Sequence, residues 1–134
     1  MHFTQRTLIA TAAAVALLVP AVPAVARNYN GAWPVTITNS QRDNGTGCLT
    51  LSGNLTSGQA SLSFGGFKYP YGQFIVLNGM IVVNITEPLY GQNGALMFIA
   101  PASRGRFGTG DFEDLRGGSN FDFGDLTFGR RNGC

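Results

Sequence analysis

Beyond residue 27, this sequence of 134 residues contains no sustained helical repeat of apolar residues. It consists instead of short runs in which apolar and polar residues alternate, separated by residues that favour turns. Alternation of this kind is typical of strands that bury one face. The pattern therefore predicts an all-β fold.

Eight strand candidates follow one another at intervals of about 8 to 13 residues. They cover 33–39, 47–52, 59–64, 73–77, 80–86, 95–100, 106–112 and 121–129. Asn78-Gly79 separates two of these runs, and this dipeptide favours a type I′ hairpin because both positions need a positive φ. The short links predict a small antiparallel barrel, eight-stranded and up-and-down, with a two-sheet β-sandwich as the alternative.

The first 26 residues have the features of a cleaved signal peptide. Arg6 supplies the positive charge, residues 8–19 are apolar, and Ala24-Val25-Ala26 forms an A-x-A cleavage site. We expect export to a periplasm or to the extracellular space, and a single domain over 27–134. Because no second long apolar run follows, we expect no transmembrane span after cleavage.

Cys48 and Cys134 are the two cysteines of the sequence. In an exported chain they predict one disulfide. Closing so long a loop contributes roughly 4 kcal/mol to stability if chain entropy dominates. Because the sequence contains no C-x-x-C pair, we expect a structural bridge and not a redox one.

Histidine is absent after the expected cleavage site, since His2 is the one histidine of the sequence. This excludes Ser-His-Asp and Cys-His nucleophile systems from the mature chain, together with histidine-ligated metal and haem sites. We expect a protein that is not an enzyme and holds no cofactor or metal. The net charge of +2 is too small to predict binding to nucleic acid.

Carboxylates gather late in the sequence, among several arginines. The acidic residues are Asp111, Glu113, Asp114, Asp122 and Asp125, and the basic ones are Arg104, Arg106, Arg116, Arg130 and Arg131. The interpretation that we favour is solvated ion pairs. Two alternatives are a calcium site built from oxygen ligands and a pair of acid–base carboxylates, drawn from Asp111, Glu113 or Asp122.

Four aromatic residues are candidates for contacts with a ligand or partner: Trp33, Tyr69, Tyr71 and Tyr90. The segment 68–72 predicts a loop, whose tyrosines would rim an apolar cavity or stack on a sugar at a barrel mouth. The alternative is a proline turn that covers the end of the core. The hairpin 74–85 is apolar on both faces, which predicts burial on both sides or a dimer contact.

Two short motifs resemble known eight-stranded barrels. Gly31-Ala32-Trp33 resembles the start of lipocalin-like barrels, in which the Trp closes one end and an Arg or Lys packs over it; here the resemblance implies that Arg130 or Arg131 has this role. Gly108-Thr109-Gly110-Asp111-Phe112, followed by Gly117, is similar to a segment of dirigent and allene-oxide-cyclase-like barrels. Both resemblances imply the barrel fold, and neither supplies functional residues.

We therefore expect an exported protein that binds a small apolar ligand or a surface partner, as a monomer or a weak homodimer. A structural, envelope-associated protein that self-associates through 74–85 is the alternative hypothesis. A carboxylate-based enzyme is the second alternative.

Overall fold

The computed structural model describes residues 28–86, 95–116 and 121–134, so the predicted signal peptide lies outside the described residues. This part of the chain forms strands and turns. No helix within it is long and apolar enough to cross a membrane. The strands are β1 Gly31–Thr38, β2 Gly45–Gly53, β3 Ser57–Phe64, β4 Phe67–Leu77, β5 Met80–Thr86, β6 Ala95–Ser103, β7 Arg106–Phe107, β8 Gly110–Asp114 and β9 Asp122–Phe128.

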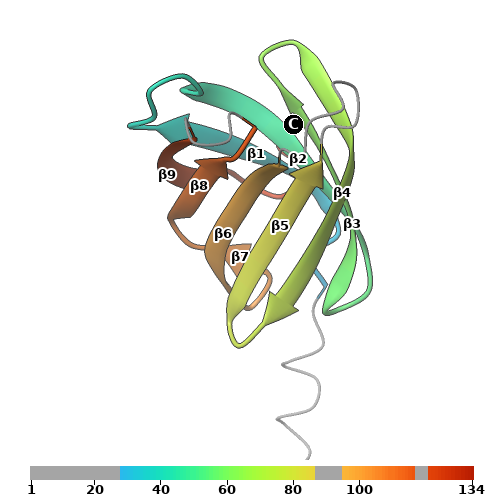
Figure 1. The fold of residues 1–134 in the computed structure, drawn as a ribbon. Coiled ribbons are helices and arrows are strands. Elements are labelled where there is room, and N and C mark those ends of the chain that lie inside the picture. Colours follow the sequence, from blue (N-terminus) through green and yellow to red (C-terminus); the bar gives the residue numbers. More distant parts are fainter. Residues whose placement is uncertain (1–27, 87–94, 117–120) are drawn as a thin grey trace, which may run out of the picture.

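Eight of these strands close into an antiparallel barrel (Figure 1). From β1 to β6 each strand pairs with the next, β6 pairs with β8, and β8 pairs with β9. β9 then returns to β1, with Val35 opposite Phe128 and Thr38 opposite Asp125. The short β7 is an addition that pairs with the end of β6. The predicted eight-stranded, up-and-down barrel is confirmed, and the structure is not the alternative sandwich.

The hairpin around Asn78-Gly79 forms as predicted. Both residues have positive φ, 53° at Asn78 and 75° at Gly79, as a type I′ turn requires. The strand predicted over 106–112 is instead divided into β7 and β8. Phe107 faces Ala102 and Asp111 faces Ile99, so the register shifts by one residue between the two pairs and interrupts the ladder.

The loop predicted over 68–72 is wrong, because β4 already begins at Phe67. Pro70 does not end the strand, since the ladder with β3 bulges there: Pro70 and Tyr71 together stand opposite Ser61. A bulge tolerates the missing N–H of a proline. The extra residue places Tyr69 toward the interior and leaves Tyr71 61% exposed on the outer wall.

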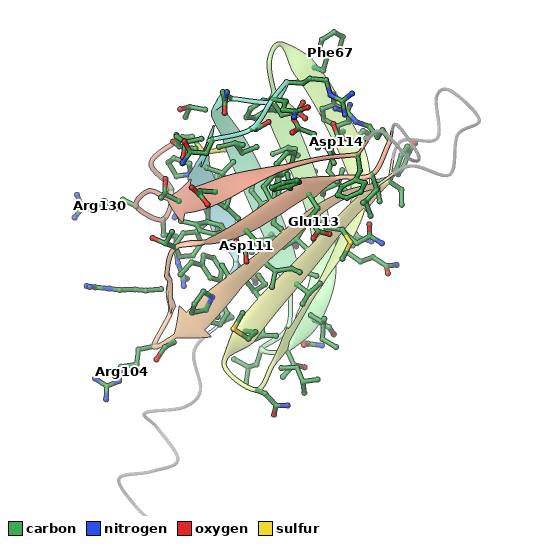
Figure 2. The ribbon with its side chains drawn as sticks, turned by 60° about the vertical axis from the view of Figure 1, so that its left-hand side comes forward. Phe67, Arg104, Asp111, Glu113, Asp114 and Arg130 are labelled. Carbon is green, nitrogen blue, oxygen red and sulfur yellow. A yellow bond between two sulfur atoms is a disulfide. The ribbon has the colours of Figure 1, made fainter. Side chains whose placement is uncertain are left out.

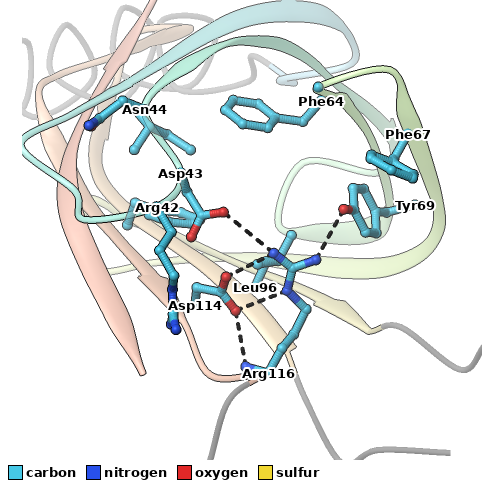
Figure 3. A pocket seen from close by; sticks show the side chains of 12 residues that line it. Arg42, Asp43, Asn44, Phe64, Phe67, Tyr69, Leu96, Asp114 and Arg116 are labelled. Atoms are coloured by element: carbon cyan, nitrogen blue, oxygen red, sulfur yellow. Dashed lines mark hydrogen bonds and ion pairs between the residues drawn. The ribbon is translucent and has the colours of Figure 1, made fainter. Parts of the chain in front are cut away.

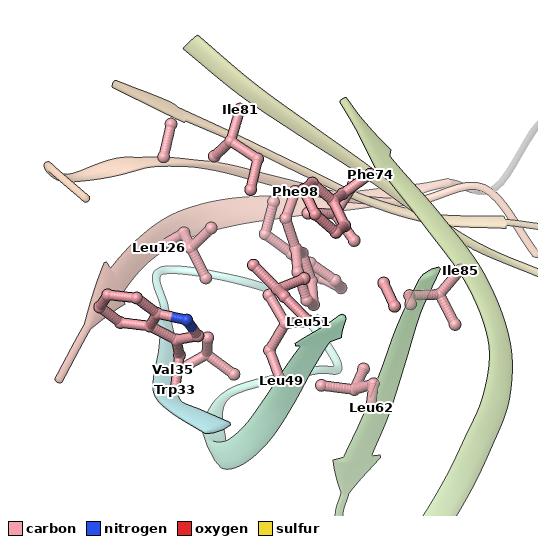
Figure 4. Close-up of a cluster of buried hydrophobic side chains, with 14 of the residues drawn as sticks. Trp33, Val35, Leu49, Leu51, Leu62, Phe74, Ile81, Ile85, Phe98 and Leu126 are labelled. Atoms are coloured by element: carbon pink, nitrogen blue, oxygen red, sulfur yellow. The ribbon is translucent and has the colours of Figure 1, made fainter. Parts of the chain in front are cut away.

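Inward-facing side chains from all eight barrel strands form one apolar core (Figure 4). Alternate positions of each strand supply it, as in any half-buried strand. One buried residue from each of the eight barrel strands is enough to trace it: Val35, Leu49, Leu62, Phe74, Ile81, Phe98, Phe112 and Leu126.

In the hairpin 74–85 only the inner face joins this core. Ile81 is buried, whereas Ile75 and Leu77 on the outer face are 47% and 62% exposed. The prediction of burial on both faces is therefore wrong for the single chain, since no second layer of described residues covers this part of the wall.

Aromatic side chains fill one end of the barrel. Phe107 lies between Tyr29, Trp33 and Phe128, with ring centroids 4.9, 4.5 and 4.6 Å away. Trp33 is buried, and its Nε1 donates a hydrogen bond to the carbonyl of Tyr29 at 2.9 Å. The guanidinium of Arg131 covers the Trp33 ring at 5.0 Å from the centroid, a favourable cation–π contact. We call this the closed end.

The predicted disulfide is confirmed. Cys48 on β2 is bonded to Cys134, across a sequence separation of 86 residues and a Cα–Cα distance of 6.1 Å. Backbone hydrogen bonds from Gly129 to Pro34 and from Asn132 to Ala32 hold the same terminal segment against β1. The bridge therefore fixes a segment that also pairs through its backbone.

The two glycines of the Gly108-Thr109-Gly110 segment should differ in their tolerance of a side chain. A Cβ at Gly110 would lie 2.1 Å from the carbonyl oxygen of Ile99, whereas at Gly108 its nearest neighbour is the Pro101 ring at 3.3 Å. We expect Gly110→Ala to lower the free energy of unfolding by about 2–4 kcal/mol and Gly108→Ala by less than about 1 kcal/mol. Urea unfolding followed by circular dichroism measures both, and equal effects would contradict the close approach.

Candidate functional site

The barrel end opposite Trp33 contains a cavity of about 680 Å³ (Figure 3). Its apolar lining comes from barrel strands and from the β3–β4 hairpin: Ile37, Phe64, Phe67, Leu96 and Phe112. Its polar lining comes from the β1–β2 loop, β4 and the end of β8: Arg42, Asp43, Asn44, Tyr69, Asp114 and Arg116. We call it the mouth cavity.

The β1–β2 loop, residues 39–44, is held by one buried carboxylate. Asp122 at the start of β9 accepts hydrogen bonds from the Ser40 hydroxyl and from the backbone N–H groups of Gln41 and Arg42, the latter two at 3.0 and 2.9 Å. Burial alone would raise the pKa of Asp122, but these hydrogen bonds outweigh it and hold that pKa well below its usual range. A charged Asp122 therefore fixes the loop over the cavity.

The side chain of Arg116 links Asp114 at the end of β8 to Tyr69 on β4. Its Nε and Nη2 donate to the two carboxylate oxygens of Asp114 at 3.0 and 2.8 Å, and its Nη1 donates to the Tyr69 hydroxyl at 3.0 Å. The hydrogen bonds to Asp114 raise the pKa of Arg116. Burial would raise the pKa of Asp114, but its hydrogen bonds, those from Arg116 foremost, outweigh this and lower that pKa. The pair is therefore ionised at neutral pH.

Asp43 lies between these two anchored carboxylates. Its Oδ1 is 3.5 Å from Nη2 of Arg116, and its Oδ2 is buried and accepts no hydrogen bond from the described residues. Burial and the neighbouring carboxyls of Asp114 and Asp122 raise the pKa of Asp43 to about 7, against the opposing effect of Arg116. Because carboxylates face it, Oδ2 gains a partner within the protein when Asp43 itself carries the proton and donates it.

The arrangement combines an apolar wall with a carboxyl group that titrates near neutral pH. Such a group donates a hydrogen bond when protonated and accepts one when ionised. Within residues 28–86, 95–116 and 121–134, no group of three or more His, Cys, Asp or Glu side chains is arranged to hold a metal ion. The chemistry that the cavity offers is hydrogen bonding next to apolar surface.

The late acidic residues do not form one cluster (Figure 2). On β8, Asp114 shares the inward face with Phe112, whereas Asp111 and Glu113 point to the outer face. Asp111 stands opposite Asp125 on β9, and Asp114 stands opposite Asp122. The structure thus places two carboxylates at the mouth and three on the outer wall, apart from them.

The aromatic candidates also lie apart. Tyr69 lines the mouth cavity, and Trp33 lies at the closed end. Tyr71 lines a separate cavity of about 490 Å³ on the outer wall. Tyr90 lies outside the described residues. Arg130 is exposed and points away from the barrel, in contrast to Arg131.

Sequence reasoning missed Asp43 and the two phenylalanines of the β3–β4 hairpin, Phe64 and Phe67. Asp43 could not be recognised as a site residue, because Asp43-Asn44-Gly45 is a sequence typical of ordinary turns. Alternation on β8 was a usable signal, since an inward Phe112 places Asp114, and neither Asp111 nor Glu113, inside the barrel.

Asp43 should make stability depend on pH. Its carboxyl has a pKa of about 7 in the folded chain against the ordinary 3.8, so the folded state holds the proton more tightly. This stabilisation is fully present below about pH 4 and is lost as the pH rises through about 7. We expect the free energy of unfolding to fall across that range and Asp43→Asn to remove the fall.

Urea unfolding at several pH values measures this dependence. Asp111→Asn is the matched control, because Asp111 is exposed on the outer wall. Asp114 and Asp122 have lowered pKa values, so they also contribute to the free energy of unfolding. That contribution is lost only below the pH range of Asp43, as each of these carboxylates takes up a proton. An unchanged slope between about pH 4 and 7 in Asp43→Asn would contradict the assignment.

The comparisons with known proteins add no family to this description. No family model matches the chain, and neither the curated proteins nor the solved structures give a match.

Proposed function

We propose that the protein binds a small molecule in the mouth cavity, without catalysing its conversion. The observation that carries this proposal is the cavity itself, at the end of the barrel where the apolar filling stops. Its volume of about 680 Å³ lies within the range of small-molecule sites, roughly 300 to 1,000 Å³. Its lining divides about equally between apolar walls and convergent polar groups, which suits a ligand with both kinds of surface.

The lining indicates a ligand with an apolar body and one hydrogen-bonding group. Phe64, Leu96 and Phe112 offer apolar and aromatic surface for the body. The polar group of the ligand would meet Asp43 and Tyr69, which lie on two sides of Arg116. Arg116 is already paired with Asp114, so its role in this proposal is to hold the polar groups in place.

We also propose that the protein acts outside the cytoplasm. The Cys48–Cys134 disulfide suits an oxidising compartment. The Ala24-Val25-Ala26 cleavage site expected from the sequence would release the domain there. Intact-mass measurement of the exported protein would give the mature start, which we expect at Arg27.

Phe67 offers the sharpest test of ligand binding. It lines the mouth cavity and is 65% exposed, while Phe123 on β9 is 64% exposed and does not line it. We expect Phe67→Ala to weaken binding of the uncharged fluorophore Nile red about 5- to 30-fold, since a buried apolar contact is worth roughly 1–2 kcal/mol. Phe123→Ala should bind as the wild type does.

Fluorescence titration measures both affinities. Equal loss in the two variants would mean that the dye binds exposed aromatic surface and not the cavity. A wild-type protein that binds no dye would remove the support for a ligand-binding barrel.

Self-association through the hairpin 74–85 is the second candidate, favoured by the exposed outer face. Ile75, Val82 and Ile99 form one row across β4, β5 and β6, and Leu77, Met80 and Pro101 form the next. Apolar rows of this kind often mark an interaction surface. A second copy of the chain is the partner that this hypothesis names.

Sedimentation velocity tests the second candidate. We expect a dimer that Leu77→Glu dissociates, because a buried unpaired charge opposes association. Phe123→Glu is the matched control on another part of the wall, with a similar exposed fraction. A wild-type protein that is monomeric at the highest accessible concentration would rule out this candidate.

A further inference from the structure

Positive charge is concentrated at the closed end of the barrel, although the net charge of the sequence is only +2. Arg104 and Arg106 flank Gly105 at the tip of the β6–β7 hairpin, and the Gly105 carbonyl oxygen lies 3.5 Å from Nη2 of Arg131. Arg130 follows β9 at the same end, and like Arg104 it points away from the barrel (Figure 2). Arg104, Arg106 and Arg130 are exposed, and none of them forms an ion pair with a described residue.

The acidic side chains of the described residues lie away from this end. Three are at the mouth and three on the outer wall: Asp43, Asp114 and Asp122, and Asp111, Glu113 and Asp125. Since no described carboxylate lies within ion-pair distance of the three exposed arginines, their charge is not neutralised within this part of the chain. A group of unneutralised cations on one surface attracts anions.

Exposed apolar residues occupy the neighbouring hairpin tips of the same end (Figure 1). Leu55 in the β2–β3 turn is 45% exposed, and Leu77 beside the β4–β5 turn is 62% exposed. The Val76 N–H donates to the carbonyl of Thr56 at 2.7 Å, which holds these two tips together. A hydrogen bond of 2.8 Å from the backbone of β6 to the carbonyl of Gly79 ties the β4–β5 turn to the strand that leads to the arginines.

We propose that the closed end of the barrel docks on the surface of a membrane that contains anionic phospholipids. Arg104, Arg106 and Arg130 contact the lipid phosphates, while Leu55 and Leu77 enter the boundary between head groups and acyl chains. A soluble polyanion such as a nucleic acid matches the arginines but leaves the leucines in water. The combination of both side-chain types therefore favours a lipid surface.

The two features support each other energetically. An arginine near an anionic membrane surface strengthens binding about fivefold, which for three residues gives only reversible association. A small apolar insertion is also too weak alone, and stable attachment to a membrane takes two signals. The proposal goes beyond ligand binding, because it uses the barrel end opposite the mouth cavity and leaves that cavity open to solvent.

Co-sedimentation with vesicles tests the docking surface. The exported protein, with its mature start determined by mass, is mixed with vesicles of phosphatidylcholine alone or of equal parts phosphatidylcholine and phosphatidylglycerol. We expect binding to the anionic vesicles only, weakened by salt. Arg104→Gln and Leu55→Ser should each reduce the affinity about 3- to 10-fold, because each removes one of the two kinds of contact.

The matched controls lie outside the closed end. Lys68→Gln removes one exposed positive charge from β4 near the mouth, and Phe123→Ser removes a side chain that is 64% exposed on β9. Both should bind as the wild type does. Equal losses in Lys68→Gln and Arg104→Gln would show that net charge governs binding, and an unchanged affinity of Leu55→Ser would show that no insertion occurs; either result overturns the proposal. Absence of wild-type binding to the anionic vesicles overturns it as well and leaves the ligand site standing.

Hydrogen exchange of the wild type gives a test without substitutions. On anionic vesicles, the amides of residues 54–57, 77–80 and 104–106 should exchange more slowly, whereas those of 39–44 at the mouth should not change. Protection of the mouth in place of the hairpin tips overturns the proposal. Protection of 77–80 that rises with protein concentration and needs no vesicles identifies a second copy of the chain as the partner, and it overturns the proposal too.

Discussion

Closure of the sheet is the constraint on which the other features depend. Once β9 pairs with β1, each of the eight barrel strands has two neighbours, and alternate side chains can only point inward. The interior is then filled from the closed end, first by Trp33 and Phe107 and further along by Phe112. Asp114 occupies the next inward position of β8, so the mouth cavity begins where a polar side chain takes the place of an apolar one on this strand.

Much of this fold could be predicted because its determinants are local. The alternation of a strand and the residues of a turn are both patterns of neighbouring residues. Asn78-Gly79, for example, specifies its hairpin through the φ angles of two adjacent residues. The errors have a local cause as well. Pro70 suggests a break, but a bulge accommodates it within β4, and a bulge depends on the partner strand that the sequence does not identify.

The site was predictable only in part, because the register between strands, and not the order of residues in the sequence, brings its side chains together. Asp114 and Asp122 were visible as acidic residues, and Tyr69 as an aromatic one. That Asp43 lies between the two carboxylates follows from the β8–β9 pairing and from the hydrogen bonds that fold the β1–β2 loop. The raised pKa of Asp43 has the same origin, since burial and neighbouring charges are properties of the assembled barrel and not of a turn sequence.

The bulge in β4 also bears on how the length of this chain can vary. Gly72 pairs with Ala60 and Tyr69 pairs with Leu62, so one residue of β3 spans two residues of β4. Removal of Pro70 would leave a regular ladder, with Tyr71 opposite Ser61 and Tyr69 still directed inward. The wall can thus lose a residue at this point while the interior keeps the same side chains, so a deletion here would change the outer surface of the barrel without changing what the cavity presents.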